Sequence, residues 1–421
     1  MSVSTNKIII LFKKNKTRIF WAIALILSVY FIYNLNSSID KSTQGFASYY
    51  TASKLLINGE KVENFYSDDW FSSKVENYVN GIYEIYFVNP PTTSLMLIPL
   101  TPFDYKTTRT FWIIFNVFLL ILSILFLIKG FDFTREWSPI VIILFLLFQP
   151  LYANIDFAQA YILIFFLLVL SWNAFRSDNQ TLLGILIGIM IVLKSAGLVL
   201  PILLIAQKKW RSLFWMMATL ISISLISLPW IGIKAWFFYG EKLLQLNSLP
   251  SLSVTAYQTI HSIFYHLFVF SQRWNPFPVI NIPALGILLS MTLSLLLLVS
   301  VIYYGFKQKK SELSFAVFII AGVVLSPVSL DYHYVVLLLP ILIFINWLKE
   351  NSTKPLWILL ILFYVLIAAE LPYTSDKLAA GWLAIFAYPK LYGAIGLLGL
   401  FFYQLFEVKF KYSKNISLSD R

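Results

Sequence analysis

Two apolar runs flank a short polar break in residues 181–207, TLLGILIGIMIVLKSAGLVLPILLIAQ. Runs of this kind are typical of segments that lie within a bilayer. The pattern predicts a helix that reaches the far surface of a membrane, breaks at Lys194-Ser195-Ala196-Gly197 and returns. Because an ammonium group is costly inside hydrocarbon, we expect Lys194 to point into a polar cavity at that surface. The alternative is a lysine that only extends its charge to the membrane surface.

The rest of the chain has the same character. Of its 421 residues, 59% are hydrophobic and 12% are charged. A soluble domain carries charged residues at about twice that density, so a soluble fold is excluded. Cysteine is absent, which excludes disulfides, thiolate nucleophiles and cysteine-based metal sites. We expect neither a metal nor a cofactor, and we attribute the net charge of +12 to membrane orientation rather than to binding of nucleic acid.

Twelve apolar runs are predicted to span the membrane. They lie near residues 19–35, 107–128, 138–152, 157–174, 181–194, 196–207, 210–231, 281–305, 312–326, 334–348, 355–371 and 388–406. The predicted fold is therefore an all-α polytopic membrane protein, with about 12 transmembrane helices in a single integral membrane domain over residues 1–421. Four prolines predict that the apolar residues 90–103 form a short re-entrant element instead of a span.

The distribution of positive charge predicts the orientation. Most of the 32 Lys and Arg fall in short segments on one side of the predicted topology, such as residues 208–211. The positive-inside rule then places both termini in the cytoplasm of a multi-pass protein of the cell (plasma or inner) membrane. Residues 36–106 and 232–280 become extracytoplasmic loops. In the first loop, Tyr49–Leu56 and Asp69–Val79 have helical periodicity, which predicts short surface helices.

Several polar residues gather on the predicted outer side. Gln159 lies at the outer end of a span, and Asp331 and His333 lie in a break between two apolar runs. A carboxylate can keep a neighbouring histidine protonated, and such a histidine binds phosphate. Asn89 opens a proline-rich turn whose free N–H groups can receive an anion. Each of these features also has a purely structural alternative. Gln159 could make a hydrogen bond between helices, and Asp331 and His333 could satisfy each other within their loop. The turn at Asn89 could only initiate a helix.

These residues suit the transfer of a sugar from a lipid phosphate. A carboxylate must deprotonate the acceptor hydroxyl, and Asp40 is distinguished by its position at the membrane boundary after the first span. Cations such as Lys194 and His333 must hold the departing phosphate. The anomeric carbon gains oxocarbenium character during such a displacement.

The segment GFASYYTASKLLING, residues 45–59, resembles the first-loop signature of glycosyltransferase family 87. The members of this family are membrane enzymes of the GT-C class that use polyprenyl-phosphate mannose. Further similarities follow in the family's order at Asn89-Pro90-Pro91, at Ala158-Gln159, at Lys194 and from Ser326-Pro327 to His333-Tyr334. The family has Asp where this chain has Gly45, and Gly-Gln where it has Ala158-Gln159.

The resemblance implies a GT-C-like bundle and an inverting hexosyltransferase. It would move a hexose, mannose in the family, from a polyprenyl-phosphate donor to a glycan or glycolipid acceptor at the extracytoplasmic face. With Gly45 at the family's base position, Asp40 is the first choice of general base, and its substitutes are Asp68, Asp69 and Glu84. Donor phosphate and sugar would contact Lys194, His333, Gln159, Asn89 and Tyr50, with Asp331 orienting His333.

Two other functions remain open at this stage. A transporter for a lipid or a solute would need a polar path through both faces, whereas the charges here gather near one face. A polymerase or ligase acting on lipid-linked glycans would share the same outer pocket.

Overall fold

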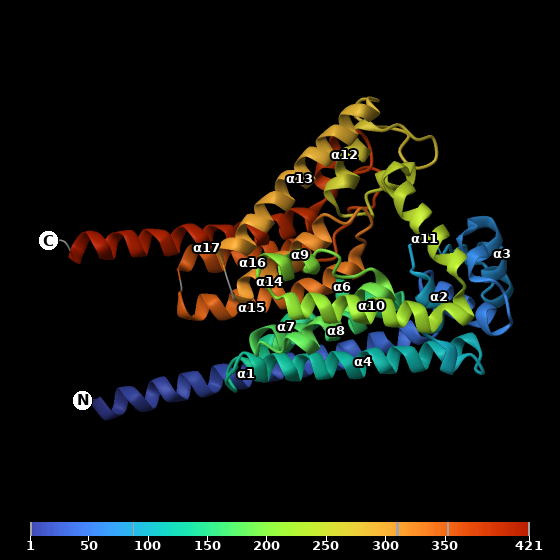
Figure 1. The fold of residues 1–421 in the computed structure, drawn as a ribbon. Coiled ribbons are helices and arrows are strands. Elements are labelled where there is room, and N and C mark those ends of the chain that lie inside the picture. Colours follow the sequence, from blue (N-terminus) through green and yellow to red (C-terminus); the bar gives the residue numbers. More distant parts are fainter. Residues whose placement is uncertain (1, 87, 309–310, 352, 420–421) are drawn as a thin grey trace.

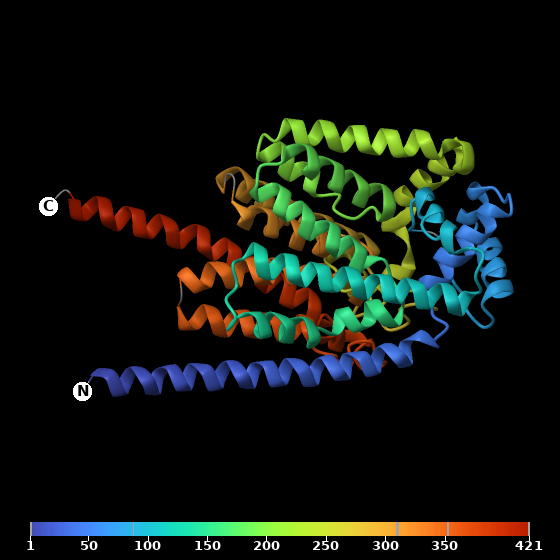
Figure 2. The ribbon, with the colours of Figure 1, turned by 90° about the horizontal axis from the view of Figure 1, so that it is seen from below.

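The chain folds as a bundle of helices. The computed structural model describes residues 2–86, 88–308, 311–351 and 353–419, and no β-strand forms within these ranges. The N-terminal helix α1 (Ser2–Ile39) and the C-terminal helix α17 (Pro389–Ser419) project from the same end of the bundle (Figures 1 and 2). Helices α2 (Phe46–Ile57) and α3 (Asp68–Tyr78) lie at the opposite end.

Every predicted apolar run contains a helix. In chain order the remaining ones are α4 (Tyr105–Gly130), α5 (Ser138–Leu146) with α6 (Gln149–Asp156), α7 (Tyr161–Arg176), α8 (Gln180–Lys194), α9 (Leu200–Ala206), α10 (Trp210–Ile231), α13 (Pro283–Lys307), α14 (Glu312–Val324), η6 (Asp331–Leu337) with α15 (Leu338–Glu350), and α16 (Lys354–Ala368). The shorter elements between them are α11 (Ile233–Gln245), η4 (Leu246–Ser248), η5 (Pro250–Ser253), α12 (Ile260–Phe268) and η7 (Gly381–Ala387).

Within the described residues, five helices are long and apolar enough to cross a membrane, or seven if two bent pairs each count as one span. The prediction of an all-α chain with membrane-spanning helices is therefore confirmed. The count of about 12 is not confirmed. Helices α7, α8, α14 and α16 have only 13 to 16 residues, whereas a perpendicular crossing takes roughly 20.

The segment after α8 returns as the sequence predicts. Helix α8 ends at Lys194, and Lys209, which follows α9, lies with its Nζ 2.5 Å from Asp178 at the start of α8. The chain has thus come back to the end from which α8 began. Helix α8 packs closely on α10, because a Cβ atom on Gly184 would lie 2.2 Å from the Ser212 carbonyl oxygen. Small residues permit such close helix approach.

The segment between α1 and α4 is folded against the bundle. The two predicted helices are present as α2 and α3, joined by the 3₁₀ turn η1 (Val62–Tyr66). Helix α2 is buried along most of its length and is not the surface helix that we expected, because η1, α3, α4 and the proline-rich turns pack around it. The predicted short element at 90–103 consists of the 3₁₀ turns η2 (Pro91–Leu95) and η3 (Ile98–Leu100).

A buried arginine holds the entrance of α2 against the bundle. Arg109, on α4, has no exposed surface. Its guanidinium donates hydrogen bonds to the Ser38 carbonyl at 3.0 Å, to Thr43 Oγ1 at 2.9 Å and to the Asp156 carbonyl at 2.5 Å. One side chain thus joins the end of α1, the turn before α2 and the end of α6.

Replacement of Arg109 by Met should destabilise the fold. The three acceptors would lose a charged donor that is fully buried, and we expect a loss of about 2–4 kcal/mol in the free energy of unfolding. Denaturant titration in mixed micelles measures this loss. Lys106→Met, one turn earlier on the same helix, is the control. Lys106 is exposed and its pair with Asp40 is a surface pair, so this variant should unfold like the wild type. Equal stability of the wild type and both variants would contradict the role of Arg109 in holding these three segments together.

Candidate functional site

Lys194 stands at the centre of a polar cluster at the end of α8. Its Nζ donates a hydrogen bond of 2.6 Å to Asn89 Oδ1. The same ammonium lies 4.8 Å from the centre of the Tyr49 ring and 5.9 Å from that of Tyr161. An amide oxygen and two aromatic faces are suitable partners for a cation that is only partly exposed. Two of the predicted residues, Lys194 and Asn89, are thus in direct contact.

The proline-rich turn is docked on the last turn of α8. The last carbonyl groups of a helix lack partners within it. Here the Thr92 hydroxyl donates to the Val192 carbonyl, and the Thr93 hydroxyl donates to the Leu193 carbonyl at 2.7 Å. These bonds place Asn89 beside Lys194. The threonine hydroxyls thus join the turn to α8, and binding of an anion by its N–H groups stays a prediction.

Gly45 gives room to the amide of Gln159. The glycine is the N-cap of α2 and has φ 79°, a backbone conformation that residues with a side chain disfavour. A Cβ atom at this position would lie 1.9 Å from Gln159 Nε2. On the other side of the amide, Gln159 Oε1 accepts a hydrogen bond from the Tyr49 hydroxyl. The buried Gln159 therefore lies within the cluster, held between two positions on one face of α2.

Glu84 supplies the carboxylate of the cluster. One of its oxygens accepts the Gly45 N–H, and the other accepts the Ile85 N–H at 2.9 Å. Burial raises the pKa of Glu84, while these two N–H groups and the positive charge of Lys194 act in the opposite direction. The net effect is a pKa above the usual range for glutamic acid. Burial likewise raises the pKa of Tyr49 well above that of a free phenol, so Tyr49 acts as a neutral donor.

His333 joins the cluster through aromatic rings. Its ring centre lies 4.2 Å from that of Tyr161 and 4.4 Å from that of Tyr332. The Leu330 N–H donates to His333 Nδ1 at 3.0 Å. A neutral imidazole that accepts at Nδ1 carries its proton on Nε2, and among the described residues Nε2–H has no hydrogen-bond partner. His333 can thus donate this proton to a ligand.

Asp331 does not orient His333, contrary to our expectation. Its carboxylate lies 3.2 Å from Nζ of the buried Lys390, while His333 Nδ1 accepts the Leu330 N–H. The chain places an unforeseen cation beside Asp331, and an ammonium is a stronger partner for a carboxylate than a neutral imidazole. The prediction of a cationic His333 held by Asp331 therefore gives way to a neutral histidine positioned by the backbone.

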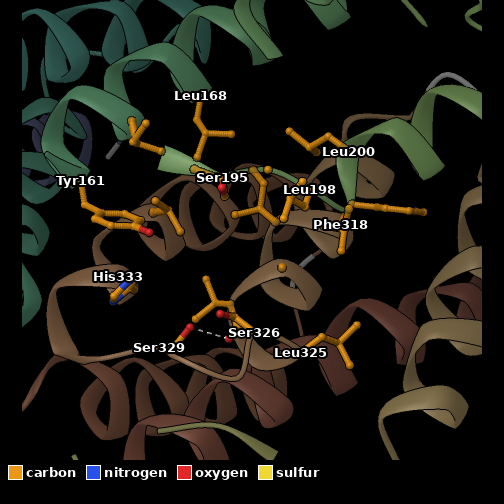
Figure 3. A pocket seen from close by; sticks show the side chains of 18 of the residues that line it. Tyr161, Leu168, Ser195, Leu198, Leu200, Phe318, Leu325, Ser326, Ser329 and His333 are labelled. Carbon is orange, nitrogen blue, oxygen red and sulfur yellow. Dashed lines mark hydrogen bonds between the residues drawn. The ribbon is translucent and has the colours of Figure 1, made fainter. Parts of the chain in front are cut away.

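A cavity of about 270 Å³ opens beside the cluster. Tyr161, Ser195 and His333 belong to its wall, and most of its other lining residues are apolar, from α7, α14 and the break after α8. Figure 3 shows Tyr161 and His333 at one end of the cavity and Leu200 and Phe318 at the other. The cavity can therefore accept an amphiphile, with a polar head near Lys194 and an apolar chain along α14.

Four of the predicted site residues lie outside the cluster. Asp40 is exposed and pairs with Lys106 at 2.5 Å. Asp68 lies 3.9 Å from Lys242, and Asp69 is exposed on α3. Tyr50 points the other way along α2, where its hydroxyl donates to the Phe103 carbonyl at 3.0 Å.

Two residues of the cluster, Tyr49 and Tyr161, were missed in the sequence. A signal for each was present. Tyr49 lies four residues after Gly45 and thus on the same face of the helix, where Tyr50 does not lie. Tyr161 follows Gln159 by two residues at the start of the next apolar run.

Comparison with known proteins identifies a family. A family model described as glycosyltransferase family 87 matches residues 87–328, more than half of the chain. The matched range contains Asn89, Gln159 and Lys194, whereas Glu84 and His333 lie outside it. No curated protein sequence and no solved structure matches the chain.

The close fit of Gly45 and Gln159 predicts that Gly45→Ala lowers the free energy of unfolding by more than backbone strain alone. Gly59→Ala is the matched control, because Gly59 has a similar φ of 82° but no atom within 4 Å of an added Cβ. The control should lose about 1–2 kcal/mol of unfolding free energy from backbone strain alone. Gly45→Ala should lose about 1–3 kcal/mol more through overpacking, and Gln159→Ala in the same chain should relieve that excess. Equal losses for the two glycine variants would contradict the fit.

Proposed function

The chain belongs to glycosyltransferase family 87, and from that premise we propose that it moves a hexose, mannose in the first instance, from a polyprenyl-phosphate donor to a glycan or glycolipid acceptor. The transfer inverts the anomeric carbon and takes place at the extracytoplasmic face of the cell membrane. One observation carries the proposal: a partly buried carboxylate, Glu84, and a partly buried ammonium, Lys194, lie in one cluster beside an apolar cavity.

Lys194 and His333 bind the donor phosphate in this proposal. The leaving group of the reaction is a prenyl phosphate, whose negative charge grows as the bond to the sugar breaks. An ammonium and an N–H donor, held in a site with little water, stabilise that charge more strongly than they would in solvent. Lys194 is already held by Asn89, and His333 Nε2–H, which has no hydrogen-bond partner in the described part of the chain, would be the second donor.

Glu84 is the general base of the proposal. As the acceptor oxygen attacks the anomeric carbon, the acceptor O–H bond breaks and its proton passes to Glu84. The bond between the anomeric carbon and the phosphate oxygen breaks at the same time, and prenyl phosphate leaves. We prefer Glu84 to Asp40 because its carboxylate lies at the Gly45 N–H, where the family resemblance implies an Asp, whereas Asp40 is exposed and paired with Lys106. Gln159 and Tyr49 position the sugar from the other side of Gly45.

The apolar cavity receives the part of the lipid next to the phosphate. A cavity of about 150 Å³ is enough for a benzene molecule, so one of about 270 Å³ admits a short hydrocarbon segment and not a whole polyprenyl chain. The remainder of the chain would stay in the bilayer. This arrangement explains why the enzyme is embedded in a membrane, because its donor cannot leave the lipid phase.

The position of the cluster supports the choice of face. Helix α2, which carries Tyr49, lies at the end of the bundle opposite to both chain ends (Figure 1). With both termini in the cytoplasm, as the distribution of Lys and Arg predicts, the cluster faces the extracytoplasmic side.

The assignment of the base predicts opposite results for two carboxylates. Glu84→Gln should lower turnover by about 10²–10⁴-fold, the usual contribution of a general base, while Asp40→Asn should keep wild-type turnover. The measurement is release of polyprenyl phosphate from a labelled polyprenyl-phosphate mannose by the purified protein in lipid. Full activity of Glu84→Gln together with an inactive Asp40→Asn would transfer the role of base to Asp40. A wild type that releases no prenyl phosphate would refute the proposed function.

The raised pKa of Glu84 predicts the pH dependence. A base works in its deprotonated form, so kcat/KM should fall as the pH drops through the pKa of Glu84, at a pH above the usual range for glutamic acid. Lys194 lowers this pKa by its positive charge, so Lys194→Met should move the acid limb to higher pH. The pH profiles of both proteins test this, and an acid limb that moves to lower pH in the variant would exclude Glu84.

A further inference from the structure

Asp331, two residues before His333, forms an ion pair with the buried Lys390. The transfer reaction as proposed makes no use of this pair. Lys390, in the first turn of α17, has no exposed surface. Its Nζ lies 3.2 Å from the Asp331 carboxylate and donates to the carbonyl groups of Ile367 at 2.8 Å and Ala369 at 3.3 Å. A charge buried among transmembrane helices is costly and usually has a functional reason.

A buried glutamine completes the connection. Gln258 has no exposed surface, and its backbone N–H donates to the Ser329 carbonyl at 2.9 Å. Its side-chain amide donates to the Ala387 carbonyl at 2.8 Å and accepts the Lys390 N–H at 3.2 Å. The Tyr334 hydroxyl donates to the Gln258 carbonyl. Gln258 therefore bonds the segment before η6 on one side and the start of α17 on the other.

The two residues enclose the segment that carries His333. Ser329 is held by Gln258, and Asp331 is held by Lys390. Leu330 lies between them, and its N–H is the donor that keeps His333 Nδ1 unprotonated. A change in the backbone conformation of this segment would break the bond from Leu330 N–H to His333 Nδ1 and allow His333 to carry its proton on either nitrogen.

We propose that Lys390 and Gln258 are positioning residues that hold residues 329–333 so that His333 presents Nε2–H to the donor phosphate. The proposal rests on the proposed function. Lys390 acts through Asp331, and Gln258 acts through Ser329. The consequence for the fold is that the C-terminal helices, which lie beyond the family match at residues 87–328, help to build the donor site.

The test uses the full-length protein in lipid bilayers with ¹⁵N-labelled histidine. The chain has three histidines, so the His333 signals can be assigned with a single His333→Gln variant. Solid-state NMR should show His333 of the wild type as one tautomer, protonated at Nε2. In Lys390→Met and in Asp331→Asn it should show both tautomers. Donor kinetics on the same samples should show kcat/KM reduced by about 10- to 100-fold, as misplacement of a binding group does, mainly through a higher donor KM.

Lys209→Met is the matched control, because Lys209 is also a buried lysine paired with an aspartate, Asp178, at the opposite end of α8. It should leave the His333 tautomer and the donor KM unchanged. Lys390→Arg keeps the positive charge, so His333 should remain mainly protonated at Nε2 and the donor KM should stay close to that of the wild type. A single unchanged tautomer in folded Lys390→Met would overturn the proposal, as would one in Asp331→Asn if Lys390→Met fails to fold.

The two levels of the proposal fail in different ways. If the wild type transfers no sugar, the proposed function is wrong, and the NMR spectra still decide whether Lys390 holds His333. If transfer is normal but the tautomer of His333 does not depend on Lys390, only the positioning role is wrong.

Discussion

The structure is organised around a positive charge that needs partners at the end of an apolar helix, α8. Lys194 ends α8, and its ammonium is only partly exposed. Asn89 supplies an oxygen, two tyrosine rings supply aromatic faces, and Glu84 supplies the opposite charge. The partners come from three parts of the chain, α2, the segment before η2 and the start of α7, and the fold has to bring each of them to α8. The threonine bonds between η2 and α8 are one means by which this happens.

A second constraint is the lack of a side chain at Gly45. The Gln159 amide takes the space that a Cβ atom would need, and the partly buried N–H of Gly45 donates a hydrogen bond to the Glu84 carboxylate. The resemblance implies an Asp at position 45, where this chain has Gly. In the proposed function the carboxylate comes instead from Glu84 in a neighbouring segment, and the glycine leaves the space that the Gln159 amide occupies.

Hydropathy and local pattern were sufficient to predict the helices, the break after α8 and the approach of Lys194, Gln159 and His333 to one another. They were not sufficient for ion pairing, because the partner of a charge is set by tertiary contacts. Asp331 is paired with Lys390, which lies 59 residues later, and Asp40 is paired with an exposed lysine of α4. The burial of α2 also escaped prediction, since its own sequence does not show that η1 and α3 cover it. Tyr49 rather than Tyr50 faces the cluster because Tyr49 lies four residues after Gly45 and so shares its side of the helix.

The most direct test is a structure of the protein in lipid with polyprenyl phosphate bound. The account predicts a phosphate oxygen within hydrogen-bond distance of Lys194 Nζ and of His333 Nε2, with the first part of the prenyl chain in the cavity along α14. A prenyl phosphate bound elsewhere, for example at the exposed pair of Lys106 and Asp40, with Lys194 still closed on Asn89, would contradict it.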